Sequence, residues 1–323
     1  MRILVLGRTG YLGAHVADRL RALPDVRVLD GGRSPGADFA VDLALDRPER
    51  LAKTLAAAAP DAVVNCAGAT GNDPVALAEV NARGPAVLCA ALREAAPEAR
   101  LVHLGSAAEY GPGAPGSRVA ESDPACPVSP YGASKLAGTV AVTASGLDAV
   151  VLRVGNPVGP GAPPTGLPGR ITALLREAGQ DPSAVLRLGD LSAYRDFVDV
   201  RDVARAVELA VTARGPLPPV LNVSTGEAVP ARDLVRALVR RSGFRGRVEE
   251  QPAGPAGVSG APGAAGAGGA AGAPGSSRSA RVSWQCSDVT AAERALGWRP
   301  EHPLDHMADA LWGAAPVDHG TGP

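Results

Sequence analysis

Short apolar runs alternate with amphipathic stretches along the first half of the chain. Continuous apolar runs of four to five residues are typical of strands buried on both faces of a parallel sheet, and apolar residues at helical spacing indicate helices between them. The predicted strands are 3–6, 26–29, 39–43, 61–65, 101–104 and 149–153, and the predicted helices are 11–23, 50–59, 74–96 and 131–144. This alternation predicts an α/β fold with a doubly wound parallel sheet.

The pattern changes after Val154. Residues 155–169 are rich in Gly and Pro, which is typical of a loop. Further helices are predicted over 171–178, 200–212, 231–241 and 304–311, and further strands over 185–188 and 220–223. We therefore expect a first domain over residues 1–154 and a smaller lobe over residues 155–323 that interleaves with it.

One segment of the second lobe has a strongly biased composition. Residues 252–277 consist almost entirely of Gly, Ala, Pro and Ser. Such a segment buries too little apolar surface to order itself, so a flexible surface insertion is expected. A collagen-like structure is excluded because glycine does not recur strictly at every third position.

The composition indicates a soluble globular protein. Of the 323 residues, 46% are hydrophobic and 20% are charged, which allows a sizeable core without disulfides or metal. The formal net charge of −1 gives no general attraction for nucleic acid or anionic membranes. The four cysteines show neither a metal-binding nor a disulfide pattern, and the N-terminal apolar run is too short for a signal peptide. We expect a cytoplasmic protein.

A glycine-rich loop directly follows the first predicted strand. Its glycines have the spacing G-x-x-G-x-x-G, which permits a tight turn and lets a pyrophosphate approach the backbone at a helix N-terminus. The alternative is a turn in which glycine serves packing only, because 40 glycines make chance matches common. The predicted dinucleotide contacts in this loop are Gly7, Arg8, Thr9, Gly10, Tyr11, Leu12 and Gly13.

Residues after the second and third strands bear on the choice between NAD and NADP. Asp30 ends the second strand, where a carboxylate binds the adenosine ribose hydroxyls and favours NAD. Arg8 and Arg33 can instead pair with a 2′-phosphate, which favours NADP. Asp42 and Leu43 are candidates for the adenine edge, with a solvated turn as the alternative. Both cofactors stay open.

The most specific signal is a tyrosine followed four residues later by a lysine. Tyr131 and Lys135 share one face of a predicted helix. A tyrosine that exchanges a proton with a carbonyl or alcohol oxygen needs a neighbouring cation, since its ordinary pKa is near 10. Lys135 would supply this charge and also hold the nicotinamide ribose. The alternative is an exposed Tyr–Lys pair without a catalytic role.

A serine lies at the end of the strand predicted over 101–104. Parallel sheets bind ligands at the carboxyl ends of their strands, so Ser106 is placed to hold the reacting oxygen near Tyr131. A serine at this place can also be a simple cap or turn residue. Tyr110 is interpreted as a packing residue, and Glu109 receives no role.

Together these residues resemble the extended short-chain dehydrogenase/reductase family, the NAD-dependent epimerase/dehydratase group. The matching runs extend over the chain: GRTGYLG, NCAG, VNARGP with Asn81, SAAEYG, PYGASK, LRVGNPVGPG, YRDFVDVRDVA, LNVSTGE and LGWRP. More narrowly, GPG at 159–161 and LGDLSAYRDFVDVRDV resemble GDP-4-keto-6-deoxymannose reductases. The resemblance implies a Rossmann-type sheet domain, a smaller C-terminal α/β substrate-binding lobe and a homodimer formed by pairing helices.

The resemblance also implies roles for single residues. The catalytic triad would be Ser106, Tyr131 and Lys135. Cofactor contacts are implied at Ala67 and Gly68, and substrate contacts at Ser106, Ala107, Asn156, Arg195 and either Arg278 or Arg281, of which we take Arg281. For Arg195, an ion pair with Asp196 or Asp199 is the structural alternative.

Departures from the family pattern narrow the activity. Family dehydratases carry an Asp–Glu pair after the catalytic Ser or Thr, whereas this chain has Ala107 and Ala108, which argues against a 4,6-dehydratase. Gly105 precedes Ser106 where two serines are common, which keeps the catalytic position. Arg8 replaces a usual small residue in the glycine loop and weakens a plain NAD assignment.

The sequence therefore predicts an NAD(P)H-dependent ketoreductase. Its substrate would be a nucleotide-linked deoxysugar or a sugar-like intermediate. An NAD-dependent nucleotide-sugar epimerase is the alternative, because the same triad serves both reactions. A non-catalytic dinucleotide-binding redox sensor is the third hypothesis, and the intact triad argues against it.

Overall fold

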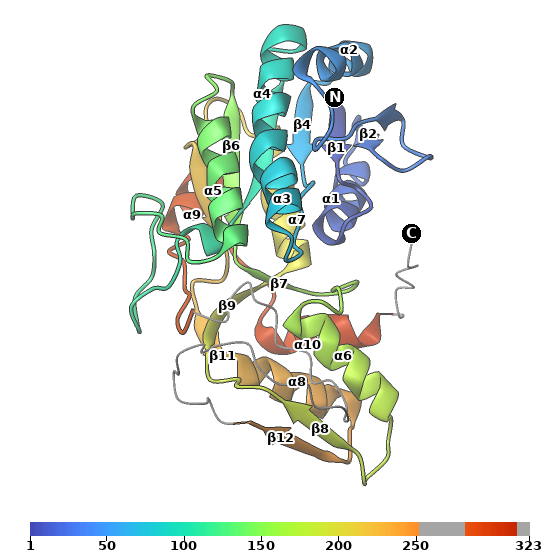
Figure 1. The fold of residues 1–323 in the computed structure, drawn as a ribbon, viewed down its shortest axis with the longest axis vertical. Helices are drawn as coiled ribbons and strands as arrows, with labels where there is room; N and C mark the ends of the chain where they lie inside the picture. Colours follow the sequence, from blue (N-terminus) through green and yellow to red (C-terminus); the bar gives the residue numbers. More distant parts are fainter. Residues whose placement is uncertain (252–281, 315–323) are drawn as a thin grey trace, which may run out of the picture.

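A seven-stranded parallel sheet forms the upper part of the protein in Figure 1. The computed structural model describes residues 1–251 and 282–314. The strand order is β10-β6-β5-β4-β1-β2-β3, and all the pairings are parallel. The strands are β1 (Arg2–Leu6), β2 (Arg27–Gly32), β3 (Phe39–Ala40), β4 (Ala62–Asn65), β5 (Arg100–Ser106), β6 (Ala149–Val154) and β10 (Val220–Val223).

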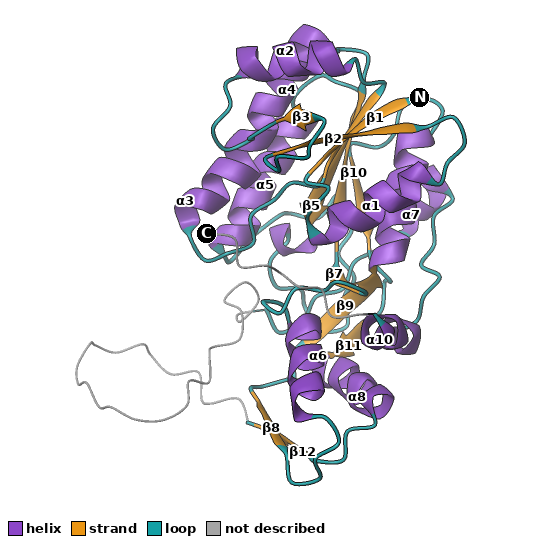
Figure 2. Cartoon of the chain, turned by 90° about the vertical axis from the view of Figure 1, so that its right-hand side faces the viewer, coloured by secondary structure: helices purple, strands orange, loops and turns teal. Residues whose placement is uncertain are grey.

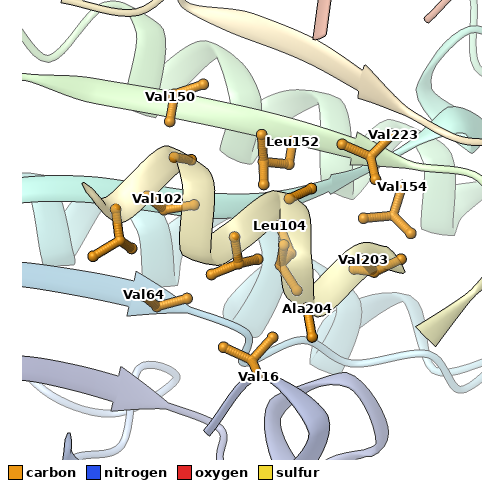
Figure 3. Packing of buried hydrophobic residues seen from close by; sticks show 14 of the residues in the cluster. Val16, Val64, Val102, Leu104, Val150, Leu152, Val154, Val203, Ala204 and Val223 are labelled. Carbon is orange, nitrogen blue, oxygen red and sulfur yellow. The ribbon is translucent and has the colours of Figure 1, made fainter. Parts of the chain in front are cut away.

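Helices cover both faces of the sheet, which confirms the predicted doubly wound fold. One face carries α2 (Pro48–Ala58), α4 (Gly84–Ala95) and α5 (Pro130–Thr143), and the other carries α1 (Tyr11–Arg21), α7 (Val200–Thr212) and α9 (Thr290–Leu296). Figure 2 shows the sheet between these two layers. In Figure 3, Val203 and Ala204 of α7 lie against Leu104 and other apolar side chains of the strands. Strands buried on both faces explain the continuous apolar runs of the sequence.

One long helix runs from Pro74 to Ala95. It comprises α3 (Pro74–Leu77), a π-helical turn (Ala78–Arg83) and α4, and Asp73 caps its start by accepting the Val75 N–H. Within residues 1–251 and 282–314, this helix alone has the length and apolar composition of a membrane span, and half of its apolar 18-residue stretch is buried. Packing against α2, α5 and the sheet explains its apolar side chains. A cytoplasmic location stays a prediction.

A second group of elements lies beneath the large sheet (Figure 1). A three-stranded sheet has the order β11-β9-β7, and a pair of parallel strands, β8 and β12, lies farther out. The elements are β7 (Asn156–Val158), β8 (Val185–Leu188), β9 (Tyr194–Asp199), β11 (Ala228–Pro230), β12 (Arg247–Glu250), α6 (Leu167–Ala178), α8 (Ala231–Ser242) and α10 (Leu304–Gly313). Their apolar side chains form a separate core cluster.

The structure differs from the predicted elements at several places. The helix predicted over 11–23 ends at Arg21, and the strand predicted over 39–43 ends at Ala40, since the chain turns where Asp42 accepts the Ala44 N–H. The sequence did not indicate β7, β9, β11, β12 or α9, which are short or carry mixed polar and apolar residues.

The chain returns to the large sheet after building part of the second group. Strand β10 pairs with β6, and α7 packs on α1, so both belong to the upper layer although they follow Val154. The division of the chain at residue 154 stays a prediction. The predicted insertion 252–277, together with Arg278 and Arg281, lies outside the described residues.

Candidate active site

The glycine loop packs directly against the backbone that follows β4. Gly7 has a φ of +78°, and a Cβ atom there would lie 2.7 Å from the amide nitrogen of Ala67. A Cβ atom at Gly13 would lie 2.0 Å from the Gly7 carbonyl oxygen. Both positions therefore require glycine on steric grounds. Gly10 caps α1 in an extended conformation, so the first backbone N–H groups of that helix remain available at the loop.

A cleft of about 320 Å³ opens where these strands end. It lies at the carboxyl ends of β1, β2 and β4, where the strand order reverses and doubly wound sheets bind ligands. Of the predicted cofactor residues, those lining the cleft are Gly7, Arg8, Thr9, Gly10, Asp30, Arg33, Asp42, Leu43, Ala67 and Gly68. Tyr11, Leu12 and Gly13 belong to α1 and do not line it. Backbone held this close by glycine, beside an open helix N-terminus, fits the pyrophosphate of a dinucleotide.

Two residues with opposite predictions for the cofactor, Arg8 and Asp30, form an ion pair in the cleft. The Arg8 Nε lies 2.7 Å from Oδ2 of Asp30, whose backbone N–H donates to Asp38. Arg33 lines the same region and is exposed. The carboxylate predicted for NAD and a guanidinium predicted for NADP are thus paired with each other, which the sequence did not indicate.

Asn81 connects the loop after β4 to the helix that carries the Tyr–Lys pair. Its buried side chain accepts the Ala69 N–H and donates to the Ala69 carbonyl, both at 2.9 Å, and donates to Ser134 Oγ at 3.1 Å. The π-helical turn at 78–83 places this amide between the two segments. The sequence offered Asn81 only as a motif match. The feature of the sequence that marks Asn81 is a polar residue within a mostly apolar predicted helix.

Helix α5 presents its first turn to the end of β5. Ser129 caps the helix by accepting the Gly132 N–H at 3.1 Å. A Cβ atom at Gly132 would lie 2.4 Å from the Ala108 carbonyl oxygen, so glycine permits this close approach. Tyr131, the second residue of the helix, is half-buried.

Lys135 is the buried member of the predicted triad. Its side chain is almost fully enclosed, and its Nζ donates to the Leu104 carbonyl, two residues before Ser106. A Cβ atom at Gly68 would lie 4.0 Å from Nζ, so the lysine lies close to one lining residue of the cleft, although its own side chain does not line it. Burial lowers the pKa of Lys135 to about 8, and the negative charge of Glu109 partly opposes this shift.

Ser106 ends β5 and begins a short 3-10 turn, Ala107–Glu109. Its Oγ accepts the Ala108 N–H at 3.2 Å, and its own N–H donates to Oε1 of Glu109 at 2.7 Å. The hydroxyl proton therefore stays available for a further acceptor. Ala107 is buried and offers no acid or base. The structure brings Ser106 and Lys135 together through the end of β5.

Two predicted substrate residues lie on the three-stranded sheet. Asn156 begins β7, and its Nδ2 donates to the Asp196 carbonyl at 3.2 Å and to Oε1 of Gln285 at 2.8 Å. Arg195 lies in β9, where its guanidinium donates to the Tyr194 carbonyl and burial lowers its pKa. Gln285, which the sequence did not indicate, is thus hydrogen-bonded to a predicted substrate residue.

The acids considered as partners of Arg195 bind other groups. Asp199 forms a two-bond ion pair with Arg201. Asp196 is fully buried and accepts four hydrogen bonds, two from Thr225 and one each from the N–H groups of Gly226 and Ser287. Asp196 therefore holds together three segments that are far apart in the sequence.

A parallel sheet with a glycine loop and a cleft at its switch point defines a dinucleotide-binding protein of the Rossmann class, and the predicted catalytic residues lie on β5, the neighbour of β4, and on α5. The described residues contain no group of three or more His, Cys, Asp or Glu side chains that could hold a metal ion. Residues 3–224 match the NAD dependent epimerase/dehydratase family, and the chain belongs to this family. The predicted family, the enzyme class and the nicotinamide dinucleotide cofactor are therefore confirmed.

Relatives and solved structures extend the match over nearly the whole chain. A dTDP-6-deoxy-L-talose 4-dehydrogenase (NAD(P)(+)) of Kitasatospora kifunensis is 39% identical over 98% of this chain and 97% of its own length. A GDP-6-deoxy-D-mannose reductase of Pseudomonas aeruginosa is 27% identical over 78% of this chain and 84% of its own length. The structure of a Thermus thermophilus UDP-glucose 4-epimerase complexed with NAD is 30% identical, covers 98% of this chain and 100% of the other, and superimposes with a TM-score of 0.73.

Proposed function

We propose that this chain reduces the 4-keto group of a nucleotide-linked 6-deoxyhexose, with NADPH or NADH as the hydride donor. The relative that is 39% identical is named as a 4-dehydrogenase of a dTDP-linked 6-deoxyhexose, and dehydrogenation run in reverse is ketone reduction. The GDP-6-deoxy-D-mannose reductase supports the same class of sugar with a different nucleotide. We take the dTDP-linked sugar as the first substrate to test.

The observation that carries this proposal is the position of Lys135. A buried ammonium one helical turn after Tyr131 lies close to Gly68, a lining residue of the cleft, and is bonded to the strand that ends in Ser106. Burying a cation is costly unless it is well bonded, so its place beside a tyrosine supports proton-transfer chemistry. A redox sensor would need no such group.

The residues divide the reaction as follows. The glycine loop and the cleft beside it would hold the dinucleotide, whose reduced nicotinamide would supply the hydride. Ser106 donates its free hydroxyl proton in a hydrogen bond to the keto oxygen, and Tyr131 transfers its phenolic proton to that oxygen as the alcohol forms. Lys135 stabilises the phenolate that remains on Tyr131. Because the pKa of Lys135 is about 8, we expect turnover to fall as the pH rises above that value.

The substrate side of the proposal uses residues of the three-stranded sheet. Asn156 and Arg195 are proposed to contact the nucleotide-sugar, and Ala107 to lie beside the sugar ring. Arg281 keeps its proposed role toward the phosphates and lies outside the described residues. Ala107 and Ala108 offer no acid–base pair, which supports reduction over a 4,6-dehydration. A homodimer stays a prediction.

A nucleotide-sugar 4-epimerase is the second candidate. It is favoured by the 30% identity to the Thermus thermophilus UDP-glucose 4-epimerase over the full length of that chain. An epimerase returns its hydride to the same sugar, so it keeps its cofactor, whereas a reductase consumes one reduced cofactor for each sugar. This difference separates the two candidates.

The test combines native mass spectrometry of the purified protein with cofactor-consumption assays. We expect an exchangeable cofactor and consumption of one NADPH or NADH per molecule of a dTDP-4-keto-6-deoxyhexose, with the GDP-linked 4-keto-6-deoxyhexose as the comparison substrate. Retained NAD together with interconversion of UDP-glucose and UDP-galactose would overturn the reductase in favour of the epimerase. Absence of retained NAD together with failure to bind either reduced cofactor would overturn both.

A further inference from the structure

A fully buried carboxylate lies directly behind Ser106. Glu109 has no exposed surface. Its Oε1 accepts the Ser106 N–H at 2.7 Å, and its Oε2 accepts the Thr139 hydroxyl and the Arg153 Nε, both at 2.8 Å. The side chain is therefore hydrogen-bonded at both oxygens inside the protein.

These bonds join the two elements that carry the triad. Ser106 ends β5, whereas Thr139 follows Lys135 by one turn on α5. Arg153 comes from β6 and stacks over the Tyr110 ring, with 4.4 Å between its guanidinium carbon and the ring centre. Glu109 thus holds the strand end that presents the serine at a fixed place on the helix that presents the lysine.

The Glu109 carboxylate lies where a side chain at residue 105 would be, and residue 105 is a glycine. A Cβ atom at residue 105 would lie 2.7 Å from Oε1 of Glu109 and 2.8 Å from Cγ1 of Val151. A side chain at 105 would therefore displace the Glu109 carboxylate from the Ser106 N–H. This contact explains why glycine precedes Ser106 in this chain, and it makes Gly105 and Glu109 one structural unit.

Glu109 also contributes the negative charge that acts on Lys135. The other titratable groups that act on this lysine are Cys66 after β4 and His103 of β5, and Tyr131 lies one turn before it on its own helix. Burial raises the pKa of the Cys66 thiol to about 12 and lowers the pKa of His103, so both side chains are neutral near pH 7. Glu109 opposes the effect of burial on Lys135 and favours its protonated form.

We propose that Glu109 is a positioning residue of this enzyme, which aligns Ser106 through its backbone N–H and places its negative charge against α5 one turn from Lys135, with Gly105 as the glycine that admits it. A buried ion pair adds little stability over a well-packed apolar pair. A carboxylate bonded to the strand and helix of the triad therefore points to alignment. The kinetic part of this proposal rests on the proposed reductase activity, and the charge part does not.

The charge on Lys135 is measurable without any substrate, because the chain contains only two lysines. The full chain is labelled with ¹³Cε-lysine and titrated by NMR, and the exposed Lys53 serves as the internal reference. In the Glu109→Gln variant we expect the pKa of Lys135 to fall by about one unit from its wild-type value, since an opposite charge has been removed. Thr139→Val is the matched control, because it removes one hydrogen bond to the same carboxylate and no charge. An unchanged Lys135 pKa in folded Glu109→Gln protein would overturn the proposal.

Turnover tests the alignment. We expect Glu109→Gln to lower kcat by about 10- to 100-fold with little change in KM, since misplacing a reacting group by about 1 Å can cost about 100-fold. The alkaline limb of its pH profile should move to lower pH, whereas that of Thr139→Val should stay in place. If Glu109→Gln does not fold, the Glu109→Gln/Arg153→Met variant, which also removes the cation left unpaired, takes its place in the kcat measurement. Wild-type kcat in either folded variant, or an unchanged pH limb in folded Glu109→Gln, would overturn the proposal.

A double-mutant cycle tests the unit of Gly105 and Glu109. We expect Gly105→Ala to lower kcat as Glu109→Gln does, and the double variant to lose little more than either single variant, because both changes remove the same contact. Losses that multiply would overturn the steric link. If the wild type turned over no keto-sugar, the proposed reductase would fail, and the lysine titration would still decide the role of Glu109.

Discussion

The two ends of the ligand site are built in different ways. At the cofactor end, backbone packs on backbone: Gly7 and Gly13 let the loop after β1 approach to distances that no other residue allows. At the proposed substrate end, side chains hold the backbone: Asp196 joins β9 to Thr225 and to Ser287 through hydrogen bonds. The first arrangement depends on the absence of side chains, and the second depends on a few fully bonded ones.

This difference affects how each end tolerates change. In the glycine loop, a Cβ atom added at Gly7 or Gly13 would clash with neighbouring backbone atoms, which have little room to move. Removing an oxygen from a buried carboxylate destabilises the fold, because the donors that bonded to it are then left without an acceptor. The chemistry is proposed to take place between the two ends, at Tyr131.

The largest loss of turnover is therefore expected from a substitution that leaves both ends of the site intact. We expect Tyr131→Phe to lower kcat by about 100- to 10,000-fold, because the proton donor is lost while the helix and cleft are unchanged. Binding of NADPH should stay near the wild-type value. Stopped-flow single-turnover kinetics and a fluorescence titration measure the two quantities.

Tyr110→Phe is the control for this change. It removes a buried hydroxyl that donates to Asn222 at 2.8 Å, so it should cost about 1 kcal/mol of stability and little turnover. Comparable turnover in Tyr131→Phe and Tyr110→Phe would rule out Tyr131 as the proton donor. The reaction would then not take place at Tyr131, between the two ends of the site.

The next effect tests the substrate end. Asp196→Asn should lower the free energy of unfolding by about 3 kcal/mol, because an amide nitrogen would face N–H groups that now donate to the carboxylate. Urea unfolding measures this loss. Asp233→Asn is the matched control: its ion pair with Arg236 is exposed and should contribute less than about 1 kcal/mol. Equal losses in both variants would show that Asp196 does not hold this end together.

The same contrast explains which parts of the structure the sequence could predict. Local rules indicated the cofactor end: apolar runs marked the strands, the glycine spacing marked the loop, and Tyr131 and Lys135 stood one turn apart. Strand β9 was missed because its residues Arg195, Asp196 and Asp199 look solvent-exposed in the sequence. They are buried since their partners come from other parts of the chain, and no local pattern records such pairs.

Residues that bridge distant segments were missed for the same reason. Gln285 bonds to Asn156, which precedes it by 129 residues, and the sequence around it carries no periodic signal. Glu109 received no role because its three partners come from β5, α5 and β6. The pairing of Arg8 with Asp30 was missed because each was judged by its own expected contact with the cofactor.

A smaller effect tests the cofactor end. Gly13→Ala should lower stability by about 1 to 3 kcal/mol and weaken NADPH binding, because its Cβ atom would lie 2.0 Å from the Gly7 carbonyl oxygen. Thermal unfolding with and without NADPH measures both effects. Gly36→Ala is the control, since no atom lies within 4 Å of a Cβ atom there. If Gly13→Ala behaved like Gly36→Ala, the loop would have room to move and the contrast between the two ends would not hold.

The smallest expected effect concerns the ion pair at the adenosine side of the cleft. Arg8 and Asp30 are partly shielded and form one charged contact at 2.7 Å, a kind of pair that contributes little to stability near a surface. A 2′-phosphate would draw Arg8 away from Asp30, whereas two ribose hydroxyls would bond to Asp30 and leave the pair in place. One pair can therefore serve both cofactors.

Arg8→Gln separates these contributions. We expect its Kd for NADPH to rise by about tenfold, equivalent to about 1.4 kcal/mol, while its Kd for NADH stays the same or falls slightly because Asp30 is released. Fluorescence titrations at low and high salt measure both constants, and the loss for NADPH should shrink as salt screens the phosphate. Arg33→Gln is the matched variant at the exposed cation of the same cleft. If Arg33→Gln weakened NADPH binding and Arg8→Gln did not, the ion pair would be a fixed support, and both ends of the site would then depend on fully bonded side chains.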